Sequence, residues 1–287
     1  MSTVQQSQAA SGTLYVVATP IGNIEDISAR AIRTLKQVAL IAAEDTRHSQ
    51  RLCQHYSIST PMISVHEHNE VARVELIQEK LMQGQDIALI SDAGTPLISD
   101  PGYKLIRELR SKNCNISPIP GPSAIITALS VAGLPTDSFS FWGFLPAKSS
   151  GRKKKFESLK HNAETLVFYE SSHRIAASLQ DAQEVLGNRK VVIARELTKT
   201  FETILSDTLE NLNVKLVDDH NQQKGEFVIL VEGLTDIVTK KEYDSERLLS
   251  VLLSELAPNK AAKLVAKLTG EKKQQIYNQA LALQAKD

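Results

Sequence analysis

The sequence is poor in cysteine, has no net charge and lacks long hydrophobic runs. Its two cysteines, Cys53 and Cys114, stand far apart and outside any metal-ligand spacing, so we expect a reduced, cytoplasmic protein without a disulfide. The 33 basic residues, Lys and Arg, equal the 33 acidic ones in number. Contacts with nucleic acid therefore have to come from local patches of charge. No apolar run approaches the roughly 20 residues of a membrane span, and we expect no membrane association.

Several catalytic and binding motifs are also missing. No G-x-G-x-x-G supports a dinucleotide site, no glycine-rich loop with Lys and Ser supports phosphoryl transfer, and no G-x-S-x-G marks a hydrolase. His66 and His68 form an H-x-H pair without a third ligand at a telling spacing, so we expect no metal. Residues 1–12 are polar and lack the apolar run of a signal peptide, which predicts a disordered tail.

The first half of the chain alternates short apolar runs with amphipathic segments. Strands are predicted at residues 13–18, 38–43, 85–90 and 114–119, and helices at residues 28–37, 71–83, 103–112 and through residue 132. Strands that are apolar throughout, with helices between them, are typical of a parallel sheet covered on both faces. We therefore expect an N-terminal α/β domain at residues 13–122.

The composition changes after Pro135. Strand-like runs, with helices between them, recur at residues 139–145, 165–169, 190–194 and 226–231, which predicts a second α/β domain at residues 123–235. Residues 147–155 combine Gly, Ser and Lys and are interpreted as a mobile basic loop. After a polar linker at residues 235–242, the end of the chain is Lys-rich and helical. We expect residues 236–287 to form a small helical domain of RNA-binding type that resembles a helix–turn–helix.

Four unusual loops follow the predicted strands of the first domain. They are Thr19–Asn23, Glu44–Arg47, the stretch "SDAGTPLISDPG" at residues 91–102, and Pro120–Ala124. The carboxyl ends of parallel strands meet at one edge of a sheet, and ligands bind there in open α/β folds. Pro96 and Pro101 fix φ, so the third loop is stiff and presents bare amides and a carboxylate at little ordering cost. We expect one ligand site built from all four loops.

Each loop also has a plainer interpretation. For residues 91–102 it is a series of ordinary turns, which explains this loop less well because the loop is longer than a turn needs. Thr19–Asn23 is compatible with an ordinary strand-to-helix turn, Asp45 or Thr46 with the cap of the next helix, and Ser123 with another helix cap. Glu44 and Asp45 offer carboxylates that bind a ligand hydroxyl or act as a base, and Arg47 offers a phosphate contact. The loops taken one at a time leave these alternatives open.

The motifs together resemble a known family. "LYVVATPIGNIEDIS", "AEDTR", "SDAGTPLISDPG", "PGPSA" and "FYESSHR" are similar to motifs of the tetrapyrrole methylase superfamily of S-adenosylmethionine-dependent methyltransferases, also called class III methyltransferases. They are most similar to the branch that acts on small-subunit ribosomal RNA. The resemblance runs from about residue 13 to residue 234, and more loosely through the tail. It implies two α/β domains with the cofactor in the cleft between them, and a homodimer.

The resemblance also implies an activity and a set of site residues. The activity is methylation of the ribose 2′-hydroxyl of a cytidine in the decoding region of 16S rRNA, on the 30S subunit. Residues implied to line the S-adenosylmethionine site are Pro20, Asp92, Ala93, Gly94, Ser123, Ala124, Tyr169, Glu196, Leu197 and Phe227. A ribose hydroxyl is a poor nucleophile, so a general base should assist. The candidates are Asp45, Glu44 and Glu170, although Glu170 is also compatible with a structural salt bridge to Arg174.

Binding of RNA requires local positive charge. The candidates for phosphate contacts are Arg47, Lys148, Arg152, Lys153, Lys154, Lys155, Arg174, Lys260, Lys263 and Lys267. Each lysine group is also compatible with a solvated surface. Two other functions remain open at this point: a small-molecule methylase of the tetrapyrrole type, and a non-catalytic RNA-binding protein of ribosome assembly. The lysines argue against the first, and the intact strand-end loops argue against the second.

Overall fold

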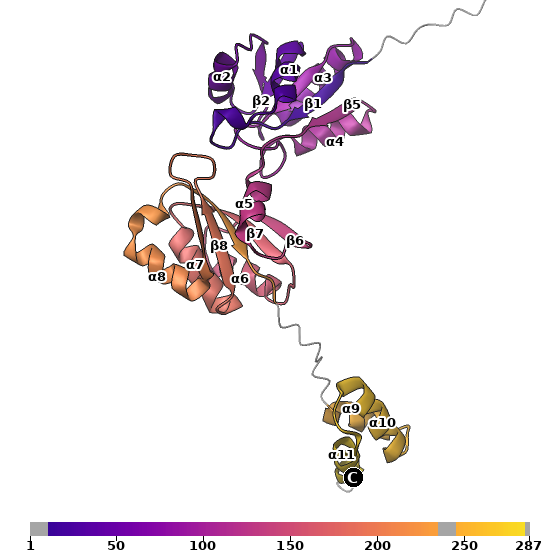
Figure 1. The fold of residues 1–287 in the computed structure, drawn as a ribbon. Coiled ribbons are helices and arrows are strands. Elements are labelled where there is room, and N and C mark those ends of the chain that lie inside the picture. The colour runs from indigo at the N-terminus through magenta and orange to yellow at the C-terminus, as the bar shows by residue number, and fades with distance from the viewer. Residues whose placement is uncertain (1–10, 235–244, 285–287) are drawn as a thin grey trace, which may run out of the picture. The chain divides into compact units, whose positions relative to one another are not determined.

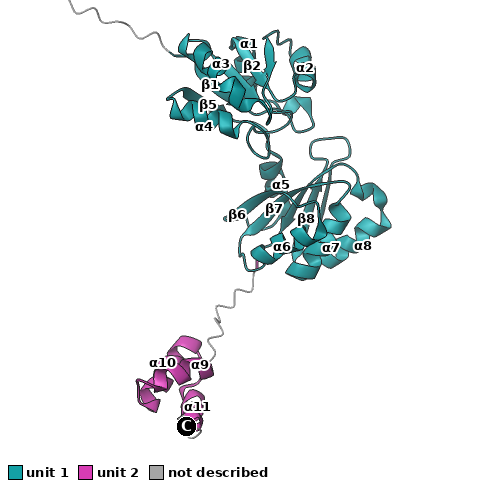
Figure 2. Ribbon diagram, turned by 180° about the vertical axis from the view of Figure 1, so that it is seen from behind, with its two compact units in different colours: residues 1–233 teal, residues 234–287 magenta. Residues whose placement is uncertain are grey.

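The computed structural model describes residues 11–234 and 245–284. Within them the chain forms two five-stranded sheets and a separate group of helices (Figure 1). It divides into two compact units with the boundary between Gly233 and Leu234 (Figure 2). Both sheets belong to the first unit, so the division at residues 122 and 123 stays a prediction. Most of the expected disordered tail, and the polar linker at residues 235–242, lie outside the described residues.

The first sheet is parallel throughout, as predicted, with strand order β3-β2-β4-β1-β5. Its strands are β1 (Thr13–Val17), β2 (Leu40–Ala43), β3 (Met62–Ser64), β4 (Ile87–Ile90) and β5 (Asn115–Ile119). Its helices are η1 (Ile24–Asp26), α1 (Ala29–Gln37), α2 (Thr46–His55), α3 (Glu70–Met82) and α4 (Tyr103–Ser111). Every residue of β2 and β4 is buried, because helices cover both faces.

The alternation of side chains along β4 shows how the two faces are filled. Ala88 and Ile90 pack with α1 and α2, whereas Ile87 and Leu89 pack with α3 and α4. Successive side chains of a strand point to opposite faces. The continuous apolar run that predicted this strand therefore serves two hydrophobic cores.

The second sheet is mixed, with strand order β6-β7-β10-β8-β9. Strands β6 (Phe139–Phe144) and β7 (Thr165–Ser171) are parallel, whereas β8 (Lys190–Arg195), β9 (Thr203–Thr208) and β10 (Glu226–Val231) join through antiparallel pairs. One face is covered by α6 (Ser149–Leu159), α7 (Ile175–Leu186) and α8 (Leu209–Asp218), and the other by α5 (Ala124–Ala132). The short helix η2 (His220–Gln223) precedes β10. We call the part of the unit around each sheet the first and the second lobe.

One sequence-based expectation for this lobe is wrong. Residues 147–155 do not form a mobile loop, because α6 begins at Ser149 and runs through the basic stretch. Arg152 and Phe156 face inward on this helix and are buried. The helical period therefore separates the basic side chains, so that they no longer form one solvated group.

The second unit is a three-helix group within the described residues. It comprises α9 (Ser245–Leu253), α10 (Pro258–Thr269) and α11 (Lys273–Gln284). Leu249, Val265 and Ile276 meet in a small core, one from each helix. Lys260, Lys263 and Lys267 are all exposed on α10. No helix in the described parts of the chain is both long and apolar enough to span a membrane.

A buried carboxylate fixes the end of the third strand-end loop. Glu70 is 3% exposed, and its Oε2 accepts hydrogen bonds from the amides of Gly102 at 3.1 Å and Lys104 at 3.2 Å. Gly102 has φ +114°, a conformation that favours glycine, and it directly precedes α4. The last residues of "SDAGTPLISDPG" therefore start a helix whose free amides are satisfied by α3.

Candidate functional site

The four strand-end loops lie together, as the sequence predicted. Thr19 and Gly94 exchange two backbone hydrogen bonds, at 2.9 and 3.0 Å, in an isolated antiparallel bridge. The Asp45 amide donates to Asp92 Oδ1 at 3.2 Å, which joins the second loop to the third. Thr95 Oγ1 donates to the Pro122 carbonyl at 3.2 Å, which joins the third loop to the fourth.

A cavity of about 480 Å³ opens between the first, third and fourth of these loops and the ends of β7, β8 and β10, whereas the second loop, Glu44–Arg47, contributes no residue to its wall. We call it the cleft. Seven of the residues expected at a cofactor line it: Ala93, Gly94, Ser123, Ala124, Tyr169, Leu197 and Phe227. The lining also includes residues that the motifs did not indicate, among them Thr95, Ser99, Asp100, Phe144, His173 and Lys199. Its size and its largely apolar wall with a few polar groups are typical of a small-molecule site.

Three of the expected cofactor residues lie outside the wall of the cleft. Pro20 does not line the cleft, whereas the next residue, Ile21, does. The amide of Asp92 donates to Glu44 Oε2 at 3.3 Å, and its carboxylate holds the Asp45 amide, so Asp92 ties two loops together. Glu196 Oε1 accepts from the Glu226 amide at 3.0 Å. Asp92 and Glu196 thus support the wall from behind.

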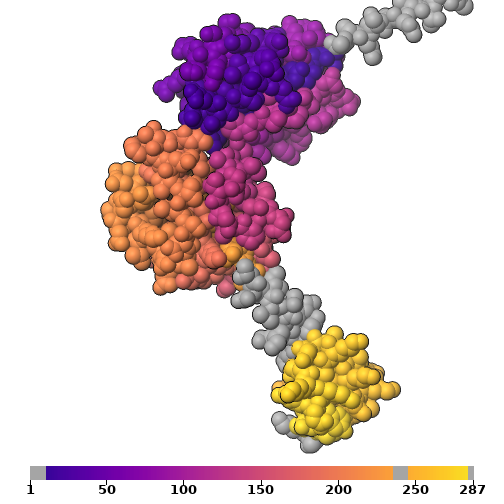
Figure 3. All heavy atoms as spheres, in the orientation of Figure 1, coloured from indigo at the N-terminus to yellow at the C-terminus, as the bar shows by residue number. Residues whose placement is uncertain are grey.

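The first loop contacts the second lobe directly. The Asn23 amide donates to Thr198 Oγ1 at 3.0 Å across a separation of 175 residues. A Cβ on Gly22 would lie 2.6 Å from Lys199 Cγ and 2.9 Å from the Leu197 carbonyl oxygen. Glycine is therefore required at this close approach. The space-filling view shows the first and second lobes in contact (Figure 3). The contact of this loop with Thr198 therefore helps to set the width of the cleft.

The loops on both sides of the cleft hold a strained backbone. Among the described residues, six other than glycine have positive φ, and four of them are Leu97 (76°), Ser99 (68°), Glu196 (49°) and Thr198 (64°). Such conformations cost roughly 1–3 kcal/mol each and persist only where the surrounding structure imposes them. Their concentration at two facing loops marks the cleft as a functional site.

Asp45 and Glu44, two expected bases, have other roles here. Asp45 caps α2 by accepting from the Arg47 amide at 2.9 Å, and it pairs with Arg47 Nη2 at 2.8 Å. Hydrogen bonding to Arg47 lowers the pKa of Asp45 to about 2, so this carboxylate is a weak base. Burial raises the pKa of Glu44, but its carboxylate is directed to the Asp92 amide and lies outside the wall of the cleft.

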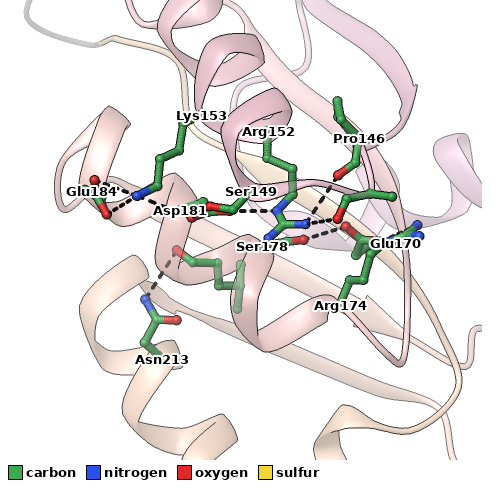
Figure 4. Close-up of polar contacts among 12 residues, drawn as sticks. Pro146, Ser149, Arg152, Lys153, Glu170, Arg174, Ser178, Asp181, Glu184 and Asn213 are labelled. Atoms are coloured by element: carbon green, nitrogen blue, oxygen red, sulfur yellow. Dashed lines mark hydrogen bonds and ion pairs between the residues drawn. The ribbon is translucent and has the colours of Figure 1, made fainter.

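The third expected base, Glu170, lines the cleft, but its carboxylate already accepts hydrogen bonds from several protein groups. Its carboxylate accepts from the Ser171 amide at 2.8 Å and from Arg174 Nε at 3.0 Å. It also accepts from Ser178 Oγ at 2.5 Å (Figure 4). Arg174 Nη2 also lies 2.9 Å from Oε1. The structural salt bridge that the sequence left open is therefore present, and it engages the Arg174 guanidinium as well.

Asp100 is the carboxylate that the motifs left without a role. It lines the cleft and is half-buried. Burial raises its pKa to about 6, with a hydrogen bond from the Ser91 side chain acting in the opposite direction, and the charges of Glu44 and Asp92 add to the increase. In the sequence, Asp100 stands out only as the second aspartate of residues 91–102. That its side chain faces the cleft is shown only by the tertiary structure.

The structure corrects the expected RNA contact at Arg152. This residue is 4% exposed, its Nε lies 2.7 Å from Asp181 Oδ2, and its Nη1 donates to the Ala147 carbonyl at 2.8 Å (Figure 4). A buried guanidinium that is paired with a carboxylate and with backbone carbonyls does not reach an external phosphate. Lys153 is also engaged, because its Nζ lies 2.7 Å from Glu184 Oε2.

The other basic candidates remain at the surface. Lys148 and Lys154 are exposed, and Lys155 Nζ lies 3.9 Å from the centre of the Trp142 ring, in a cation–π contact. The Arg47 side chain is 89% exposed despite its ion pair with Asp45. Phosphate binding by these residues stays a prediction.

Comparison with known proteins identifies the family of this chain. Residues 13–213 match the model of the Tetrapyrrole (Corrin/Porphyrin) Methylases, and residues 241–284 match that of the RsmI C-terminal HTH domain. Ribosomal RNA small subunit methyltransferase I of Pseudomonas aeruginosa is 51% identical over 280 residues, which cover 96% of this chain and 99% of that protein. The protein of the same name from Escherichia coli O157:H7 is 48% identical over 281 residues, covering 98% of each. The chain belongs to the ribosomal RNA small subunit methyltransferase I family of tetrapyrrole methylases.

Solved structures of this fold are more distant in sequence. A uroporphyrin-III-C-methyltransferase from Thermus thermophilus is 17% identical with a TM-score of 0.55, and the match covers 77% of this chain and 94% of that one. A diphthine synthase is 13% identical with a TM-score of 0.59, covering 77% and 90%. These matches confirm the predicted fold. As a family member the chain is a methyltransferase that uses S-adenosylmethionine.

The residues of the cleft fit this cofactor. Ile21, Leu197 and Phe227 provide an apolar wall suited to an adenine ring. Ser123 stands at the start of α5 without capping it, so its hydroxyl is not used by the helix. Gly94, at φ +76°, brings the bare backbone of the third loop to the same wall.

Proposed function

We propose that this protein methylates the ribose 2′-hydroxyl of a cytidine in the decoding region of 16S rRNA, on the assembled 30S subunit. One observation carries the proposal. Nearly the whole chain matches proteins named for methylation of small-subunit ribosomal RNA, and the two sequences compared above are 51% and 48% identical to it. Such a substrate implies a cytoplasmic protein. The exposed lysines of α10, within the helix–turn–helix match, support a nucleic-acid substrate in preference to a small tetrapyrrole.

The cofactor supplies an activated methyl group when it is bound. We propose that it lies in the cleft against Ala93, Gly94, Ser123, Ala124, Tyr169, Leu197 and Phe227. The protein then has to align the ribose hydroxyl with the methyl group and exclude water. A cytidine in a loop or single strand suits this arrangement, because its 2′-hydroxyl can enter a cleft that a regular helix would not.

The proposal includes a homodimer. Strand β6 is an edge strand of the second sheet and exposes Phe139 and Trp142, and Ile126 and Val131 are exposed on α5. An exposed apolar group of this kind commonly marks a protein–protein interface. Sedimentation equilibrium of the full chain should give twice the mass of 31.6 kDa, and the monomer mass at micromolar concentration would contradict the dimer.

Small ribosomal subunits from cells that lack this protein provide the test of function. Incubation with the purified protein and labelled S-adenosylmethionine should label one cytidine ribose of 16S rRNA, located by primer extension and mass spectrometry. Labelling of intact subunits but not of naked RNA would support an assembled substrate. Methylation of a tetrapyrrole without labelling of rRNA would contradict the proposal, and so would binding of subunits with no transfer.

A substitution at Ala124 tests the position of the cofactor. Ala124→Leu adds three carbon atoms to the first residue of α5, at the wall of the cleft. We expect the Kd for S-adenosylmethionine to rise at least about tenfold, or 1.4 kcal/mol, as measured by isothermal titration calorimetry. Ala177→Leu, at an exposed position of α7, is the matched control and should bind normally. Unchanged affinity in Ala124→Leu would place the cofactor elsewhere.

A further inference from the structure

We propose that Phe144 stacks on the base of the nucleotide whose ribose is methylated, and so positions that ribose in the cleft. The inference rests on the proposed function and adds a substrate-binding residue to it. Phe144 is the last residue of β6, lines the cleft and is 57% exposed. A large apolar side chain left exposed in the wall of a binding site is suited to the flat face of a ligand ring.

An irregularity in β6 directs Phe144 toward the cleft. Phe141 pairs with Val167 and Phe144 pairs with Tyr169, so β6 contains one more residue than β7 between the two pairs. Gly143, with φ +66°, supplies the backbone conformation of this bulge. Because side chains alternate along a strand, the extra residue places Phe144 on the same face of the sheet as Phe141. Bulges that re-aim a side chain in this way are common beside active sites.

Tyr169 holds one side of the Phe144 ring and links it to the proposed cofactor site. The two ring centroids lie 5.4 Å apart with an interplanar angle of 57°, and Tyr169 also packs edge-on against Phe141 at 4.9 Å. This contact fixes the Phe144 ring and leaves more than half of the side chain free. Since Tyr169 lines the same cavity as Ala124 and Phe227, a base on Phe144 would lie beside the cofactor, where its ribose has to receive the methyl group.

The groups around Phe144 are those that an unpaired RNA base requires. A Cβ on Gly143 would lie 3.7 Å from Ser99 Oγ, so the end of β6 meets the third strand-end loop. Ser99 and His173 line the same cavity and offer a hydroxyl and an imidazole for hydrogen bonds to a base edge. Lys148, four residues after Phe144, is exposed and offers a positive charge to a neighbouring phosphate. Proteins recognise unpaired bases by this combination of aromatic stacking with contacts to the base edge.

The other exposed aromatic residues of β6 differ from Phe144. Neither Phe139 nor Trp142 lines the cleft. Trp142 packs against Lys155 of α6, with Nζ 3.9 Å from the ring centre, so it serves the opposite face of the sheet. A second copy of this chain is the partner that we expect for those two residues. A base is the partner that we expect for Phe144, because its exposed ring is continuous with the cavity of the cofactor.

The variant Phe144→Leu removes the ring and keeps an apolar side chain. With small subunits as substrate we expect kcat/KM to fall by about 10–100-fold, the range expected for loss of one stacked base. Phe144→Tyr keeps the ring and should stay within about threefold of wild type. In both variants the Kd for S-adenosylmethionine, measured by calorimetry, should change by less than about threefold. Phe201→Leu is the matched control, because its side chain is 69% exposed and outside the wall of the cleft, and it should retain the wild-type rate.

Photo-crosslinking detects the stacked base without methyl transfer. Small subunits reconstituted with 16S rRNA that is partly substituted with iodocytidine are mixed with the protein and irradiated. A crosslink to Phe144, identified by mass spectrometry of the peptide, is expected because this reaction is efficient between stacked rings. The crosslink should be absent from Phe144→Leu and present in Phe144→Tyr.

The outcomes separate this inference from the proposed function. Wild-type protein that labels no rRNA would refute the proposed function, while the crosslink still reports whether a base lies on Phe144. Wild-type kcat/KM in Phe144→Leu, or equal losses in the Leu and Tyr variants, would overturn the stacking role alone. A Kd for S-adenosylmethionine raised about tenfold in Phe144→Leu would place this ring in the cofactor site. The monomer mass for that variant in sedimentation, with a dimeric wild type, would place it in the dimer interface, and either result would overturn the inference.

Discussion

Replacement of Arg152 by alanine is expected to lower the free energy of unfolding by about 3 kcal/mol. The change removes the 2.7 Å ion pair with Asp181 and leaves that carboxylate, 6% exposed, without its main partner. Breaking one side of a buried pair typically costs 3–5 kcal/mol, because the other charge stays desolvated. The lower end of this range of free energies applies here because Ser149 Oγ still donates a hydrogen bond to Asp181 at 2.8 Å. Urea unfolding followed by circular dichroism measures the effect.

An exposed arginine provides the control for this experiment. Arg107 pairs with Glu108 at 3.0 Å, but its side chain is 60% exposed, so Arg107→Ala should cost less than about 1 kcal/mol. Equal effects of the two substitutions would contradict the structural role of Arg152. Wild-type stability in Arg152→Ala, together with weaker RNA binding, would restore the sequence-based interpretation of a phosphate contact.

Neutralisation of the α10 lysines is expected to weaken binding of small subunits about 100-fold at low salt. Lys260, Lys263 and Lys267 recur at spacings of three and four residues, are exposed, and lie opposite the buried Ala261 and Val265. A stripe of this kind contacts phosphates and releases counterions. In the triple Gln variant the slope of log affinity against log salt should therefore become shallower by about 3, as measured by filter binding at several salt concentrations.

The control variant removes three positive charges from the first unit in place of α10. Lys36 on α1, Lys112 directly after α4 and Lys190 on β8 are exposed in the first unit. Their triple Gln variant should bind subunits within about threefold of wild type. Both variants should bind S-adenosylmethionine normally, because none of the six lysines lines the cleft. A salt slope that changes equally in the two variants would indicate a general charge effect and contradict a role for α10.

Much of the fold was predictable because the local pattern of apolar residues indicates which segments are buried. β2 and β4 are apolar at every position, which indicated a covered parallel sheet. β3 was not predicted because it has only three residues. β9 was not predicted because it is an edge strand in which only two residues, Ile204 and Leu205, are apolar. The antiparallel pairing of β10 depends on contacts between residues far apart in the chain, which no local pattern records.

The site was predictable to the level of its loops and less so to the level of its atoms. The motifs indicated the correct edge of the sheet, because residues such as Gly94 and Ser123 directly follow strands. They did not separate Asp92, which ties two loops together, from Asp100, which lines the cleft. Likewise Arg152 resembled its lysine neighbours until the helical period of α6 placed it inward. Side-chain direction in a loop or along a helix depends on packing partners that the sequence does not name.

The central place of β10 has a consequence for synthesis of the protein. β10 pairs with both β7 and β8, yet it follows them by some tens of residues in the chain. The first sheet is complete once β5 has left the ribosome, whereas the second has a gap at its centre until residue 231 is made. During that interval β7 and β8 each present an unpaired edge, the feature that promotes aggregation of nascent chains. Early termination before β10 should therefore yield a folded first lobe attached to an insoluble second one.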